Sequence, residues 1–137
     1  MPTLNLYTNV PVDAVIASDI LRDATKAVAK ILGKSESVLY HICCTYSVIS
    51  IERCLAIFSS NVISVVQYVM ILINGGVPIA FAGTEAPAAY GELISIGSLG
   101  PSVNGKLSST IAEILQTKLL IDSSRFYIKL YDVEVIY

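Results

Sequence analysis

The chain repeats one order of secondary structure: a short strand, an amphipathic helix and a second strand. In the first copy, residues 3–8 alternate apolar and polar side chains, which predicts a strand. A helix is predicted after an N-cap at Ser18, because apolar side chains recur at helical spacing as far as Leu32. Gly33 and Lys34 are typical of a helix end, since glycine accepts left-handed geometry and lysine complements the helix dipole.

The second copy follows the same order in the last third of the chain. Residues 93–99 predict a strand, and Ser102 can cap a helix that continues to Leu119. A turn at residues 122–124 then leads into a strand of aromatic and branched residues at 125–132. A helix that connects two strands of one sheet implies that the strands are parallel. The pattern therefore predicts an α/β domain built from βαβ units.

Thirty strongly apolar residues, 38–67, separate the first helix from its expected strand at residues 68–73. One interpretation is a membrane span, which needs about 20 clean apolar residues. Charged residues at 52–53 and polar residues at 59–61 interrupt this segment, so we expect no span. A β-prone insertion is a second interpretation. A third is a retained intron, because the segment begins with valine (codons GTN) and ends with glutamine (codon CAG).

Charge and cysteine usage exclude several classes of function. The chain carries 9 basic and 11 acidic residues, so no basic surface is available to neutralise the phosphates of a nucleic acid. Its three cysteines, Cys43, Cys44 and Cys54, lack the spacing of a zinc site or a disulfide framework, and His41 has no partner at ligand spacing. We therefore expect no metal and no cofactor. The N-terminus has no signal-peptide pattern, so the expected location is cytoplasmic.

A proline stands at position 2. Removal of the initiator methionine, which is usual before a small residue, would make the nitrogen of Pro2 a free secondary amine. An ordinary α-amino group has a pKa of about 7.7–8.0, and apolar surroundings lower it. A neutral amine near the working pH can act as a general base. The alternative is that Pro2 is a tolerated N-terminal residue without a chemical role.

Without residues 38–67, the chain resembles the macrophage migration inhibitory factor (MIF) family, which includes D-dopachrome tautomerase, and looks most similar to its plant members. The resemblance is carried by MPTLNLYTNVPVD, ILGK, VPIAFAGTEAPAAYGELISIGSLG and SSRFYIKLYD. It implies a homotrimer of α/β (α+β) subunits, each with two pseudo-repeated βαβ units, a four-stranded sheet and two helices on one face. We therefore expect residues 1–137 to form a single MIF-like domain, interrupted by an apolar insertion at 38–67.

The resemblance also implies an activity and a set of site residues. Family members interconvert keto and enol forms of phenylpyruvate-like acids or D-dopachrome, and the N-terminal proline, here Pro2, moves the proton. Lys34 matches the lysine that attracts the substrate carboxylate, and Ile96 matches an apolar wall residue of the pocket. Tyr127 matches a tyrosine that arrives from the neighbouring subunit. Lys129 stands where animal members carry an active-site asparagine.

Three functional hypotheses stay open on the sequence. The first is a tautomerase-type isomerase that acts on a small aromatic keto acid. The second is a cytokine-like interaction protein with a vestigial pocket and a receptor protein as partner; secretion without a signal peptide stays open with it. The third is a defective splice isoform, because the chain diverges from the family at Val135 and lacks a segment that helps bind adjacent subunits. With the apolar residues 38–67, this loss leads us to expect that the intact chain does not form a clean trimer.

Overall fold

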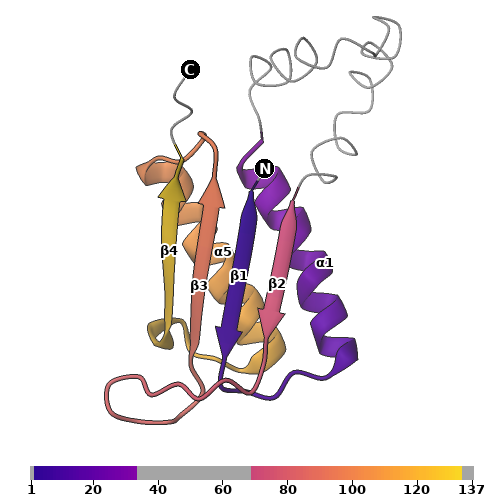
Figure 1. Ribbon diagram of the computed structural model, residues 1–137, viewed down its shortest axis with the longest axis vertical. Coiled ribbons are helices and arrows are strands. Elements are labelled where there is room, and N and C mark those ends of the chain that lie inside the picture. Colours follow the sequence, from indigo (N-terminus) through magenta and orange to yellow (C-terminus); the bar gives the residue numbers. More distant parts are fainter. Residues whose placement is uncertain (1, 34–68, 134–137) are drawn as a thin grey trace, which may run out of the picture.

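A computed structural model describes residues 2–33 and 69–133 of the chain. A four-stranded sheet with strand order β2-β1-β3-β4 packs against two helices (Figure 1). The elements are β1 (Thr3–Thr8), α1 (Ala14–Ile31), β2 (Met70–Asn74), β3 (Ala89–Ser95), α5 (Pro101–Leu119), a short 3-10 helix (Ser123–Arg125) and β4 (Phe126–Asp132). The predicted α+β architecture is confirmed. The predicted insertion at 38–67, with His41 and the three cysteines, lies outside the described residues.

The sheet joins two parallel pairs through one antiparallel pair. β1 is parallel to β2 and β3 is parallel to β4, as expected for two βαβ units, whereas β1 and β3 are antiparallel. The starts of β1 and β2 therefore lie at the same end of the sheet as the ends of β3 and β4. We call this the Pro2 end, because Pro2 immediately precedes β1.

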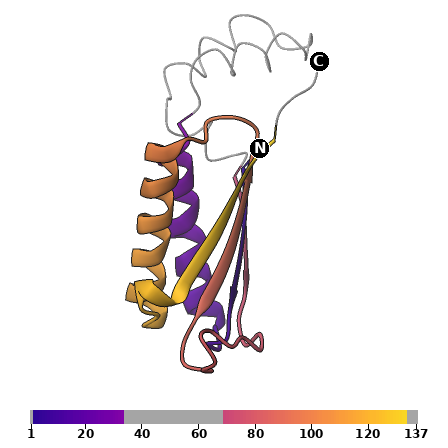
Figure 2. The ribbon, with the colours of Figure 1, turned by 90° about the vertical axis from the view of Figure 1, so that its left-hand side faces the viewer.

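Only one face of the sheet is covered by helices. Figure 2 shows α1 and α5 side by side against one face, with the other face open. Leu4, Leu6 and Leu93 point toward the helices and are 0–1% exposed. They pack with buried side chains from both helices, among them Ile20, Val28, Leu107, Ile111 and Leu115. Burial of this set drives folding, since each fully buried side chain of this size contributes about 1.5–3 kcal/mol.

The open face of the sheet carries large apolar side chains in the single chain. It includes residues from the two edge strands and from β3: Met70, Leu72, Ile94, Tyr127 and Tyr131, each between 38% and 66% exposed. Exposed apolar surface spread over neighbouring strands marks an interaction site in a protein of this size. This face is therefore suited to contact another protein surface.

Both helices begin earlier than predicted. The N-cap of α1 is Asp13, whose side chain accepts a hydrogen bond from the backbone N–H of Ile16 at 2.8 Å, and Ser18 lies inside the helix. The N-cap of α5 is Gly100, which has no side chain to cap the helix. Pro101 follows it, and its fixed φ suits the first helical position. Ser102, the predicted cap, is thus already helical.

The boundaries of β3 also shift, and the backbone geometry at the end of α1 differs from the prediction. β3 begins and ends four residues before the predicted strand. It ends at Ser95 because Gly97 and Ser98 adopt positive φ values of 70° and 69° and form a turn. α1 ends near Gly33 as predicted, but its C-cap residue Leu32 is right-handed and Gly33 does not adopt the expected left-handed geometry. The Leu32 N–H instead continues the helical pattern by donating to the Val28 carbonyl oxygen at 2.9 Å.

A loop at residues 79–88 crosses the far end of the sheet and is held by two polar side chains. The Asn9 amide donates to the carbonyl oxygens of Glu85 and Ala86, each at 3.0 Å, and its oxygen accepts from the Ala88 N–H at 2.9 Å. The Arg125 guanidinium donates to four carbonyl oxygens of this loop at 2.9–3.4 Å, of which that of Ala86 is shared with Asn9. The loop is therefore fixed through its main chain.

We predict that Asn9→Ala destabilises the fold by about 1–3 kcal/mol, because removal of the amide leaves several loop groups without their hydrogen-bond partner. Urea denaturation at fixed protein concentration measures the change. Asn74→Ala is the matched control, since Asn74 is exposed at the end of β2 and the described residues give its side chain no hydrogen bond. Equal losses in the two variants would contradict this prediction.

Candidate active site

Pro2 lies at the buried head of the strand that runs through the middle of the sheet. Its side chain is buried, and its carbonyl oxygen accepts a hydrogen bond from the Met70 N–H at 3.0 Å. This bond ties the start of β1 to the start of β2. Pro2, the predicted general base, therefore has a hydrogen-bonded backbone and a buried side chain.

Ile96 lies at the same end of the sheet as Pro2. The antiparallel register pairs Thr3 with Ile94, and one further step along both strands brings Pro2 beside Ser95. Ile96 follows directly, and 43% of its surface is exposed. The apolar side chain of Ile96 is thus partly exposed at the Pro2 end. Of the predicted site residues, Pro2 and Ile96 are the two that one described chain brings together.

Asp132, which was not predicted as a site residue, fixes the turn that carries Ile96. Its carboxylate accepts a hydrogen bond from the Gly97 N–H at 2.7 Å, and the hydroxyl of Ser95 donates to the Gly97 carbonyl oxygen at 3.0 Å. The Val133 N–H donates to the Ser95 carbonyl oxygen at 2.8 Å. The end of β4 therefore positions the wall residue. A lone aspartate at a strand end gives no sequence signal of such a role.

Lys34 lies outside the described residues. The described chain stops at Gly33, just after α1, and Figure 1 shows that this end of the helix lies at the Pro2 end of the sheet. The main chain thus reaches the edge of the candidate site immediately before the predicted carboxylate-binding lysine.

Tyr127 lies at the far end of the sheet from Pro2. Tyr7, Tyr90 and Tyr127 stand side by side across β1, β3 and β4. Five residues of β1 separate the levels of Pro2 and Tyr7, which corresponds to about 17 Å at 3.4 Å per residue. Tyr127 is 66% exposed and packs on the ring of Phe81, with 5.1 Å between ring centroids. One chain therefore does not bring Tyr127 to its own Pro2.

Lys129 lies on the open face midway along the sheet, where it stands next to a tyrosine–carboxylate pair. The Tyr90 hydroxyl donates to the Glu92 carboxylate at 2.6 Å, and the Lys129 ammonium lies 5.7 Å from the centroid of the Tyr90 ring. Tyr90, followed by the charge of Tyr131, raises the pKa of Lys129 above its usual value. Hydrogen bonding to Glu92 raises the pKa of Tyr90 as well. Lys129 is therefore a cation at every physiological pH.

Tyr90 and Glu92 were not predicted as site residues. Their only sequence signal is the spacing Tyr-x-Glu within a strand, which places both side chains on one face. They also line a hollow of about 540 Å³ on the open face, together with Tyr7 and residues 77–80. This hollow lies toward the far end of the sheet, away from Pro2. The hollow beside Tyr90 and the Pro2 end are thus two separate places on one chain.

The described part of the chain offers no metal centre. Among residues 2–33 and 69–133, no group of three or more histidine, cysteine, aspartate or glutamate side chains is placed to hold an ion. No helix within these ranges is long and apolar enough to cross a membrane.

Comparison with known proteins agrees with this geometry. A four-stranded sheet built from two βαβ units, with two helices on one face, is the fold of MIF-like structures. The family model for macrophage migration inhibitory factor matches residues 51–136. A macrophage migration inhibitory factor homolog of Brugia malayi is 33% identical over 134 residues, which cover 98% of this chain and 90% of that protein. The corresponding homolog of Trichuris trichiura is 32% identical, covering 97% of this chain and 90% of that protein.

Solved structures show the same likeness. A homologue from Prochlorococcus marinus has a TM-score of 0.71 and 26% identity, covering 96% of this chain and 89% of that one. The factor from Trichinella spiralis has a TM-score of 0.66 and 27% identity, covering 98% and 95%. The chain belongs to the macrophage migration inhibitory factor family.

Family membership supports a function of the tautomerase or cytokine-like kind, and it suggests oligomeric assembly. The likeness to plant members stays a prediction. The family match begins at residue 51, which falls inside the predicted insertion at 38–67, and it runs past Val135 to residue 136. The boundaries of the insertion and of the divergent C-terminus therefore also stay predictions.

We predict that Tyr90→Phe lowers the pKa of Lys129 toward its ordinary value, because Tyr90 is the largest cause of the upward shift. Glu92→Gln should lower it less, since Glu92 is the smallest of the groups that raise it. NMR titration of the lysine side chain at alkaline pH measures both variants. Because the pKa of Lys129 is higher in the folded chain than in the unfolded chain, its charge contributes to the free energy of unfolding at pH values below the unfolded-state pKa. This contribution is lost as the pH rises through the folded-state pKa. An unchanged lysine titration in Tyr90→Phe would refute the assignment.

Proposed function

We propose that the protein is a tautomerase-type isomerase that interconverts the keto and enol forms of a phenylpyruvate-like acid. Pro2 is its general base and acid after removal of Met1. The observation that supports this most directly is the burial of Pro2 at the Pro2 end, beside the turn that carries Ile96. Membership in the macrophage migration inhibitory factor family supports the reaction class.

The proposed reaction is a proton transfer between carbon and oxygen. The neutral nitrogen of Pro2 removes a proton from the carbon next to the keto group, and the electrons of the C–H bond form the enol double bond. The carbonyl oxygen then receives the proton, and the nitrogen returns to its neutral form. Burial of the proline ring disfavours the protonated amine and so keeps a base available near neutral pH. Lys34 attracts the substrate carboxylate, and Ile96 contacts its apolar part.

The proposed site is completed by a second subunit. Tyr127 and Lys129 lie on the same open face of β4, away from Pro2 of their own chain. That face is also rich in exposed apolar side chains, which association would cover. We therefore place Tyr127 and Lys129 at the pocket of a neighbouring chain. Lys129 brings a second cation to that pocket, whereas an asparagine would bring a neutral donor and acceptor.

We predict that tautomerase activity depends on a free Pro2 nitrogen. One extra residue between Met1 and Pro2 makes this nitrogen an amide without a basic lone pair, so turnover of phenylpyruvate should fall about 10²–10⁴-fold, the range typical of a lost general base. Pro2→Ala keeps an N-terminal amine and should retain more activity than the extended chain. In the processed protein, kcat/KM should rise with pH through the pKa of the amine. Full activity in the extended chain would rule out Pro2.

We predict that Lys129→Asn raises turnover of phenylpyruvate several-fold. A lysine ammonium is a hydrated point charge, whereas an asparagine amide can donate to and accept from the substrate. Lys26→Asn is the control, because Lys26 is exposed on α1, on the other side of the sheet from the open face. Native mass spectrometry of both variants checks that the assembly is unchanged. A fall in turnover, or an equal change in the two variants, would count against this role.

The second candidate is a cytokine-like interaction protein. The observation that favours it is Lys129, which together with Tyr90 and Glu92 gives the open face a charged group where animal relatives carry a neutral one. The same experiment separates the two functions. A folded oligomer with no turnover in the native chain and in Lys129→Asn would favour the interaction protein. An intact chain that forms no stable oligomer would favour the defective isoform.

A further inference from the structure

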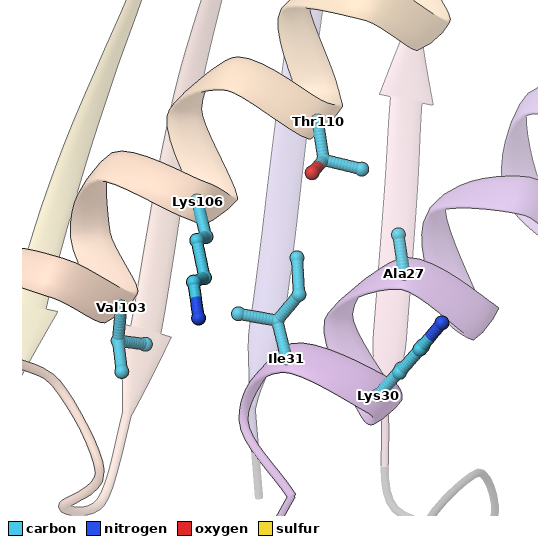
Figure 3. Close-up of a pocket in the computed structure, with 6 residues that line it drawn as sticks. All are labelled: Ala27, Lys30, Ile31, Val103, Lys106 and Thr110. Atoms are coloured by element: carbon cyan, nitrogen blue, oxygen red, sulfur yellow. The ribbon is translucent and has the colours of Figure 1, made fainter.

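A groove between the two helices lies on the opposite side of the molecule from the open sheet face. It has a volume of about 360 Å³ and runs between the last turns of α1 and the first turns of α5. Its lining residues come from both helices: Ala27, Lys30, Ile31, Val103, Lys106 and Thr110. Figure 3 shows Lys106 and Ile31 extending into the space between the helices, with the Thr110 hydroxyl one turn further along α5.

The rim of this groove is positive. Lys30 and Lys106 are exposed, and within the described residues neither has a carboxylate within 4 Å. The first turn of α5, next to Lys106, contains no acidic residue. Two cations therefore stand at one seam without an acidic partner in the described chain, although the whole chain has a net charge of −2.

The other end of the same seam shows what a compensated lysine looks like. There Lys118 of α5 lies 3.4 Å from the carboxylate of Asp19 and 3.6 Å from that of Asp23, both on α1. Hydrogen bonding to Lys118 lowers the pKa of Asp19, which keeps the pair charged. The interface between α1 and α5 thus has an ion-pair cluster at one end and two lysines beside the groove at the other.

The floor of the groove is apolar and firmly held. Ile31 and Val103 are partly buried and pack against the main hydrophobic core, and Ala27 leaves room between the helices. Ligand pockets range from about 300 to 1,000 Å³, so the groove suits a small ligand. An exposed lysine contributes little to binding by itself, and the apolar floor is needed to hold a ligand against water.

We propose that this groove binds a small organic anion with an apolar body. The carboxylate or phosphate head would lie beside the Lys106 ammonium, and the apolar body would lie on Ile31 and Val103. Figure 3 shows the Lys30 ammonium on the other side of Ile31, where it adds to the positive charge of the rim without contacting the same head group. Lysine ammonium groups accept either head, because they act as point charges without the planar geometry of arginine. The site is separate from the candidate active site and does not depend on the proposed reaction.

The test is a titration of the full chain with hexanoate, followed by NMR of labelled isoleucine, valine and threonine methyl groups. We expect the signals of Ile31, Val103 and Thr110 to shift. Lys106→Gln should weaken binding roughly two- to fivefold, the range for one exposed charge pair, and Lys30→Gln should weaken it by less. Hexyl phosphate should bind at the same methyl groups, whereas hexan-1-ol should bind more weakly and respond to neither substitution. Higher salt should weaken hexanoate binding, because exposed charges are screened.

Lys26→Gln is the matched control, since Lys26 is also exposed on α1 but does not line the groove. All three substitutions replace surface side chains, and an unchanged methyl spectrum without ligand verifies the fold. Three results would overturn the proposal. The first is that Lys26→Gln weakens binding as much as the groove substitutions. The second is that hexan-1-ol binds as tightly as hexanoate. The third is that the shifts are confined to Ile96, which would assign the anion to the candidate active site.

Discussion

The pairing of β1 with strands that run in both directions determines where each functional residue lies. Because β1 is parallel to β2 and antiparallel to β3, the start of β1 lies beside the end of β3 at the Pro2 end of the sheet. Pro2 and Ile96 come together for this reason. Because β4 is parallel to β3, the start of β4, with Tyr127, lies at the opposite end of the sheet. A single sheet topology thus separates the two halves of the proposed site.

The sequence predicted the elements better than their ends. Periodicity is a property of many residues, so the strands and the two helices are predictable. A helix start depends on which of several nearby residues reaches a free N–H. Asp13 does so for α1 although Ser18 is an equally good capping type. At α5 the fixed φ of Pro101 defines the start, and no side-chain cap is present.

The site was predictable only in part, because its supporting contacts join distant segments. The resemblance indicated Pro2, Lys34, Ile96, Tyr127 and Lys129, and all of these except Lys34 lie within the described residues. It gave no sign of Asp132, which holds the Gly97 turn across 35 residues of sequence. A contact of this kind depends on strand register, and register follows from the packing of the whole sheet. Tyr90 and Glu92 were missed for the same reason, since their value to Lys129 arises only when β3 and β4 are aligned.

The way the loop at 79–88 is held has a consequence for its surface. Asn9 and Arg125 form hydrogen bonds almost entirely to main-chain carbonyl oxygens of this loop, and every amino acid has such an oxygen. The side chains at positions such as Ile79, Glu85 and Ala86 take no part in those bonds. Apart from Phe81, whose ring packs on Tyr127, and Ala82 and Gly83, whose φ values are positive, the loop can therefore change its charge and contact shape by substitution while its path stays the same. Two residues outside the loop hold its backbone, so the outward surface is free to diverge in evolution without disturbing the sheet beneath it.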